Sequence, residues 1–124
     1  MIGMVGLLGF VNEKLEEIGI PYEFGEWTKT VSYPYFVGSF QETDYRFEDN
    51  CTIGVFTLEG WSRESKIDLA TASDKIRDAF QDVQEVRDNT AFFIHFGGSM
   101  TILTGEADLF KISITLYTYE WKGE

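Results

Sequence analysis

The chain has 124 residues and a formal net charge of -11, from 21 acidic and 10 basic side chains. Its length fits one domain, residues 1–124, and its content of 44% hydrophobic and 16% aromatic residues excludes a disordered tail. The charge disfavours binding to nucleic-acid phosphates or to anionic membranes. Because the acidic residues are spread from Glu13 to Glu124 without a long run, they predict a solvated acidic surface.

The N-terminal segment has the period of an amphipathic helix. One face carries the apolar residues Met4, Leu7, Leu8, Val11, Leu15 and Ile18. Gly19 and then Pro21 predict its end. The apolar start lacks the basic flank and the cleavage site of a signal peptide and is too short to cross a bilayer. We therefore expect a buried helix here.

Two strand-like segments follow, Tyr35–Phe47 and Cys51–Trp61, with a turn predicted at Glu48–Asn50. The preceding stretch, Tyr22–Tyr33, is mixed and aromatic, and no element is assigned to it. In the second strand the side chains alternate between two faces. One face has Thr52, Gly54, Phe56 and Leu58, and the other has Cys51, Ile53, Val55 and Thr57.

A second helix is predicted over Ser65–Phe80. Ser65 is placed to cap it, with Asp68 three residues later in a position like that of a capping box. Its apolar stripe consists of Leu69, Ala72, Ile76, Ala79 and Phe80. We expect Leu69, Ile76 and Phe80 to pack against Phe56, Ile112 and Ile114 in the core.

The C-terminal third is predicted to be sheet. Ala91–Phe96 is one strand, and Met100–Leu103 is either its partner or its continuation past two glycines. After a turn at Thr104–Asp108, the segment Phe110–Leu116 alternates as a half-buried strand does. The predicted fold class is therefore α+β. Two helices would pack on one face of a mostly antiparallel sheet of four or more strands, in the order α-β-β-α-β-β.

Residues suited to catalysis or metal binding are few. His95 is the single histidine and lies within a strand, so a surface or subunit-boundary position explains it better than a general base. Cys51 is the single cysteine and is interpreted as a small buried residue. Glu42 and Asp44 could share a strand face, but they do not make a metal site alone. The sequence has no phosphate-binding glycine motif. We therefore predict a protein that is not an enzyme and has no catalytic, metal or cofactor-binding residues.

Several aromatic residues exceed what the core needs. Tyr117, Tyr119 and Trp121 stand on the face of the last strand that should be solvated. Surplus aromatic side chains are typical of partner surfaces. The predicted oligomer or partner interface comprises Trp27, Tyr35, Phe36, Phe40, Tyr117, Tyr119 and Trp121.

Short residue runs resemble a known family. They are Ile20–Trp27, Tyr35–Glu42, Phe56–Arg63, Thr104–Gly105, Leu109–Leu116 and Glu120–Lys122. These runs resemble the tail terminator family of long-tailed bacteriophages and prophages, also described as tail completion or head–tail joining proteins. The chain departs from the family at Phe92–Phe96, where the family has a more polar strand.

The resemblance implies a structural virion protein without catalytic residues or cofactors. Such proteins form a ring, commonly a hexamer and in some cases only on the tail. The ring stops polymerisation of the tail tube and joins the tail to the head. The implied partners are further copies of the chain, the tail tube protein and head connector proteins. DNA would pass through without specific binding, and no membrane is involved. The implied location is the virion tail, and the bacterial host cytoplasm during assembly.

Two other classes of function are compatible with the composition. The charge of -11 also suits a small acidic inhibitor or immunity-type protein that covers a basic site on its target. An enzyme without a recognisable motif is the third alternative. Measured self-association would favour the ring-forming protein over the inhibitor, because an inhibitor would stay monomeric until its target is added.

Overall fold

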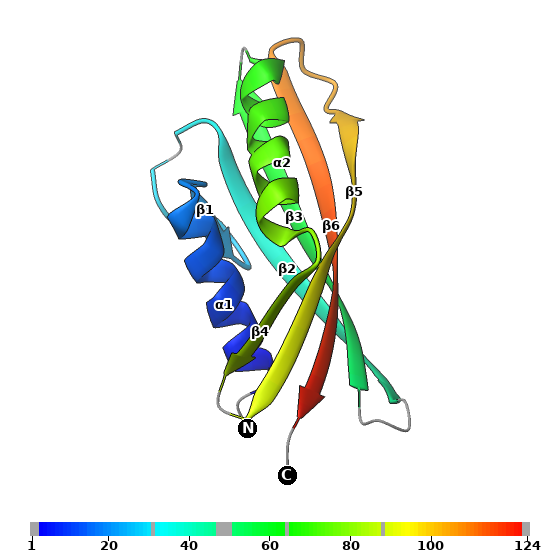
Figure 1. Ribbon diagram of the computed structural model, residues 1–124. Coiled ribbons are helices and arrows are strands. Elements are labelled where there is room, and N and C mark those ends of the chain that lie inside the picture. Colours follow the sequence, from blue (N-terminus) through cyan, green and yellow to red (C-terminus); the bar gives the residue numbers. More distant parts are fainter. Residues whose placement is uncertain (1–2, 31, 47–50, 64, 88, 123–124) are drawn as a thin grey trace.

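The computed structural model describes residues 3–30, 32–46, 51–63, 65–87 and 89–122. Figure 1 shows two helices lying over one strongly twisted sheet. The elements in chain order are α1 (Gly3–Glu17), β1 (Tyr22–Phe24), β2 (Tyr35–Arg46), β3 (Cys51–Arg63), α2 (Lys66–Phe80), β4 (Val83–Arg87), β5 (Thr90–Leu103) and β6 (Leu109–Lys122).

The sheet contains six strands in the order β1-β2-β3-β6-β5-β4. β1 runs parallel to β2, and the other neighbouring strands are antiparallel. Four strands are long, with 12 to 14 residues each, whereas β1 and β4 have only 3 and 5. The two short strands therefore cover only part of each sheet margin.

The predicted α+β arrangement is wrong. The element order is α-β-β-β-α-β-β-β rather than α-β-β-α-β-β, and the sheet is mixed, with strands containing about twice as many residues as the helices. β1 has too few residues to show a period, and β4 follows α2 almost directly. Of the two alternatives for Met100–Leu103, continuation of the preceding strand is confirmed, because β5 runs past Gly97–Gly98 with a shift in register.

The first helix forms as predicted. Leu7, Val11 and Leu15 have no exposed area, which confirms the apolar stripe. Met4 belongs to the same stripe, but its side chain lies outside the described residues. The helix ends where Gly19 adopts a φ of 77°, a left-handed conformation that glycine tolerates without a side-chain clash.

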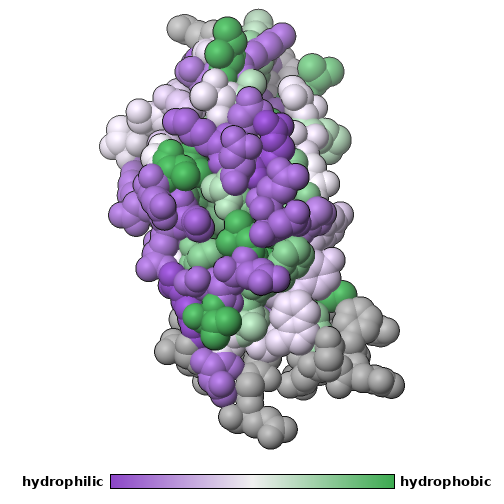
Figure 2. Space-filling view, viewed as in Figure 1, coloured by the Kyte–Doolittle hydropathy of each residue, from purple (hydrophilic) through white to green (hydrophobic). Residues whose placement is uncertain are grey.

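The second helix begins at a capping residue, as predicted. The backbone N–H of Asp68 donates to the Ser65 hydroxyl oxygen over 3.2 Å. The predicted stripe is buried, apart from Ala79, which is partly buried and packs against the same core. Figure 2 shows that the opposite, exposed surface of the helices is largely hydrophilic. It carries the exposed acids Glu13, Glu16, Glu17, Asp68, Asp74 and Asp78.

Replacing Ser65 with alanine is expected to lower the free energy of unfolding by about 0.5–2 kcal/mol. The substitution removes the acceptor for the Asp68 N–H, a group that has no acceptor within the helix. Urea unfolding followed by circular dichroism measures the change. Ser65→Asp restores an acceptor and should recover most of the loss, and an equally large loss in both variants would contradict the capping role.

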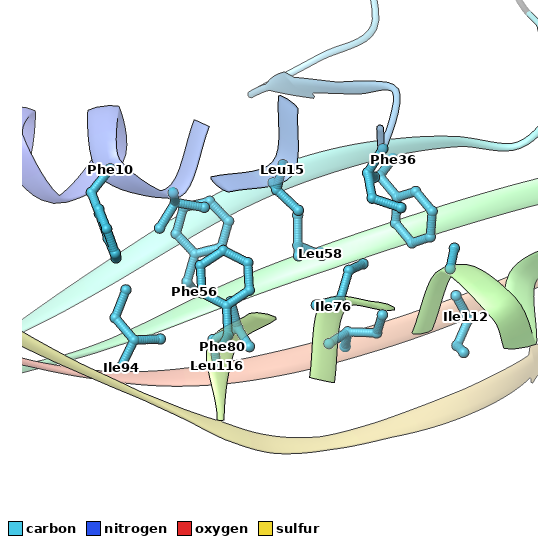
Figure 3. Packing of buried hydrophobic residues seen from close by; sticks show 14 of the residues in the cluster. Phe10, Leu15, Phe36, Phe56, Leu58, Ile76, Phe80, Ile94, Ile112 and Leu116 are labelled. Atoms are coloured by element: carbon cyan, nitrogen blue, oxygen red, sulfur yellow. The ribbon is translucent and has the colours of Figure 1, made fainter. Parts of the chain in front are cut away.

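One hydrophobic core lies between the helices and the sheet (Figure 3). The alternation predicted for Thr52–Leu58 is confirmed, since Phe56 and Leu58 are fully buried in it. The expected burial of Leu69, Ile76 and Phe80 is also confirmed. The turn predicted at Glu48–Asn50 and its preceding residue Phe47 lie outside the described residues.

Candidate interaction surface

The opposite face of the sheet, here called the outer face, bears the other set of strand side chains. Directly opposed residues of antiparallel strands share a face. On β3 and β6 these pairs include Ile53 with Tyr119 and Val55 with Tyr117. Both helices pack on the core side, so neither covers this face. The segment between β1 and β2 packs on one end of it, where Trp27 and Tyr33 contact Tyr35. The aromatic residues of the outer face gather near two ends of the sheet.

The first group is the C-terminal aromatic patch, defined by Phe93, Tyr117, Tyr119 and Trp121. The ring centroids of Tyr119 and Trp121 are 6.4 Å apart, and those of Phe93 and Tyr119 are 5.8 Å apart. Tyr117 is 40% exposed, and the other three rings are partly exposed. The predicted trio on β6 therefore lies together on the open face of the sheet, where it can meet a partner.

The second group is the Trp27 cluster, defined by Trp27, Tyr33, Tyr35 and Trp61. Tyr35 is at its centre, with ring centroids 4.9 Å from Trp27, 5.7 Å from Tyr33 and 5.2 Å from Trp61. Burial, together with the nearby Tyr33, raises the pKa of Tyr35, so its phenol stays neutral. Besides these ring contacts, Trp27, Tyr33 and Trp61 each lie near a cation.

The loop that carries Trp27 is ordered by Glu23. The Glu23 carboxylate accepts hydrogen bonds from the hydroxyl of Thr28 over 2.6 Å and from its backbone N–H over 2.9 Å. These hydrogen bonds lower the pKa of Glu23. The loop is thereby fixed against the end of the sheet.

Three cations lie at the Trp27 cluster, and two of them are paired with acids. The third, Lys29, lies 5.8 Å from the Trp27 ring centroid. Arg63 lies 5.5 Å above the Tyr33 ring and donates to Asp108 over 2.9 Å. Lys111 lies 5.1 Å from the Trp61 centroid and 2.9 Å from the Glu59 carboxylate. Such paired cations do not form a phosphate-binding surface.

Two predicted interface residues face the core instead. Phe36 has no exposed area and packs in the core, so its assignment to a partner surface is wrong. Phe40 is partly buried against the same core, with its ring centroid 6.1 Å from that of Phe56. Both lie on the inner face of β2 because their opposed residues, Gly60 and Phe56, lie there too.

The structure adds two aromatic residues that sequence reasoning missed. Phe93 joins the C-terminal aromatic patch and Trp61 joins the Trp27 cluster. The alternation of Ala91–Phe96 could have placed Phe93 opposite to the buried Phe92. Trp61 is the last residue of the predicted strand Cys51–Trp61. Alternation along that strand places its side chain on the face opposite to Phe56 and Leu58.

The isolated histidine lies at the surface. His95 Nδ1 is 3.2 Å from an Asp82 carboxylate oxygen, and its ring stacks 6.5 Å from that of Tyr117. Cys51 is buried at the start of β3, where its backbone is paired with that of Trp121. Glu42 and Asp44 lie on β2, but the side chain of Asp44 is outside the described residues. Within the described ranges, His, Cys, Asp and Glu do not gather in any group of three that could hold a metal ion.

A scan against protein-family models found no matching family. A search of curated proteins likewise found no matching relative. Within the described ranges, neither helix is long and apolar enough to cross a membrane.

Proposed function

We propose that this chain is a structural protein of a bacteriophage or prophage tail. It forms a ring at the end of the tail tube, stops further polymerisation of the tube and joins the tail to the head. Its partners are copies of itself, the tail tube protein and head connector proteins. It acts in the virion tail after assembly in the cytoplasm of the bacterial host, and it is not an enzyme.

The C-terminal aromatic patch is the observation that carries a role in assembly. Phe110, Ile112, Ile114 and Leu116 already supply the inner face of β6. The rings of Tyr117, Tyr119 and Trp121 lie on the outer face of β6 and so are not part of that core. Partly exposed tyrosine and tryptophan side chains are enriched among residues that anchor interfaces. Such a surface supports assembly of the chain with further copies of itself.

The tail-specific part of the proposal rests on the residue runs that resemble tail terminators. Three of these runs lie on neighbouring strands, with Tyr35–Glu42 on β2, Phe56–Arg63 on β3 and Leu109–Leu116 on β6. The departing segment, Phe92–Phe96, lies on β5. It includes Phe93, so the chain carries an aromatic ring in the patch where the family is more polar.

The charge of the chain agrees with passage of DNA through a ring. At a net charge of -11, each copy repels phosphates, so DNA could move past without being retained. The same charge makes copies repel each other. Raised salt should therefore strengthen self-association by screening this repulsion.

The double variant Tyr119→Ser/Trp121→Ser tests the proposal. Losing two interface anchors is expected to weaken self-association on the order of 100-fold. Sedimentation across protein and salt concentrations measures this, and tail length in a phage complementation assay measures function. Ile67→Ser is the matched control, because it removes an apolar side chain that is 76% exposed on α2, away from the patch.

Circular dichroism must first show that the double variant is folded. If it still forms rings and gives tails of normal length, the C-terminal aromatic patch is not the contact, and the Trp27 cluster becomes the next surface to test. A chain that stays monomeric and instead binds a basic target would support the inhibitor alternative. A catalytic activity that depends on His95 would overturn the structural role.

A further inference from the structure

The second half of β5 forms an open edge of the sheet. β4 pairs with β5 only from Thr90 to Ile94. From Phe96 to Leu103, β5 has β6 on one side, and no described strand pairs with its other side. The backbone groups that point away from β6 along this segment are therefore available to another strand.

Apart from the register shift at its start, between Phe96 and Gly98, this β5 edge lacks the features that normally prevent strand pairing. It has no charged residue and no proline from Phe96 to Leu103, and its side chains Met100 and Leu103 are 62% and 96% exposed. It also lies within Asn89–Gly105, the longest stretch of the chain without an acidic residue. A second copy with a charge of -11 would meet little repulsion here.

A groove runs beside the β5 edge, on the side where α2 begins. Its volume is about 480 Å³, and its lining includes Lys66, Thr101, Leu103 and Phe110. The Lys66 ammonium lies 5.4 Å from the Phe110 ring centroid. Among the described residues, no carboxylate forms an ion pair with Lys66. The groove also contains Glu106, whose carboxylate lies 3.4 Å from the Arg63 guanidinium and is paired with it. It thus offers an incoming strand apolar surface and the Lys66 ammonium.

The opposite margin of the sheet has a matching open edge. β1 pairs with β2 only from Phe36 to Gly38, and no described strand pairs with this side of β2 from Ser39 to Arg46. This segment has the same length as the open segment of β5. Because neighbouring strands alternate in direction from β2 to β5, the two edges run in opposite directions. Two copies placed side by side would therefore bring β5 of one and β2 of the other together as an antiparallel pair.

We propose that the β5 edge of one copy pairs with the β2 edge of a second copy, which continues the sheet from subunit to subunit. This contact deepens the proposed ring assembly and rests on it. It is head-to-tail, as a ring requires. The open segments lie at opposite ends of the sheet, so successive copies are staggered, as the strands of a closed barrel are.

A specific ion pair follows from this contact. Glu42 is opposed to Gly54 and so lies on the inner face of β2, the face on which the helices pack. If both copies keep their helices on the same side, Glu42 of the second copy faces the groove that contains Lys66 of the first. Opposite charges then meet at a junction between two acidic subunits.

A charge-swap experiment tests the proposal in the full-length protein. Lys66→Glu and Glu42→Lys are each expected to weaken self-association about tenfold in sedimentation velocity, because each places like charges together. The double variant Lys66→Glu/Glu42→Lys should recover most of the association. Both residues are partly or fully exposed, so the monomer should remain folded. Lys75→Glu, an exposed position further along α2, is the control for the change in net charge.

The outcomes separate this contact from the ring proposal itself. If wild type associates and both single variants associate equally well, or if the double variant is weaker than both, strand pairing at these edges is wrong while the ring proposal stands. If wild type remains monomeric in solution, complementation supplies the readout. Tails of abnormal length for each single variant and normal length for the double variant support the contact. Wild type that neither associates nor complements overturns both proposals.

Discussion

Phe80→Ala is expected to lower the free energy of unfolding by about 3–5 kcal/mol. Phe80 is the last residue of α2 and has no exposed area. Its side chain belongs to the cluster of buried residues, shown in Figure 3, that includes Phe56 and Leu116. Removing the ring would leave a cavity that these fully buried neighbours cannot fill without moving from their own contacts.

Thermal or urea unfolding measures this loss. Ile67→Ala provides the control, because Ile67 lies on the same helix but is 76% exposed, and its truncation should change stability by less than about 0.5 kcal/mol. A loss below half a kilocalorie per mole for Phe80→Ala would mean that this helix face does not pack on the sheet.

Gly60→Ala is expected to lower the free energy of unfolding by about 1–3 kcal/mol, although the substitution adds only one methyl group. A Cβ atom at Gly60 would lie 2.2 Å from Cε2 of Phe36. Phe36 is fully buried in the core, so its ring cannot move aside cheaply. The glycine on β3 therefore makes room for an aromatic ring from β2, and the two strands pair at that point.

Gly9→Ala is the matched control, since a Cβ there would meet no atom within 4 Å. Gly9 lies within α1, where alanine favours the helix by about 0.5–1 kcal/mol relative to glycine. Chemical denaturation of both variants should give changes of opposite sign. Equal stability of Gly60→Ala and wild type would contradict the close packing of Phe36 against β3.

The sequence by itself determined the elements whose hydrophobic period extends over many residues. The stripes that include Leu15 and Ile76 predicted both helices, because a period of 3.6 can bury only one face of a helix. The alternation over Phe110–Leu116 predicted part of β6 in the same way and showed that Tyr117, Tyr119 and Trp121 exceed the needs of the inner face. These are local properties, so they can be read without knowledge of neighbouring strands.

Only the tertiary structure decided how these elements combine. β1 and β4 are short and gain their strand conformation from pairing with β2 and β5, so they carry no period of their own. Phe36 illustrates the same limit. Its aromatic neighbours Tyr35 and Tyr33 suggested a surface cluster, but pairing with Gly60 turns Phe36 toward the core. Strand order and register arise from contacts between residues distant in sequence. These contacts brought aromatic rings from different strands together and left the two edges open.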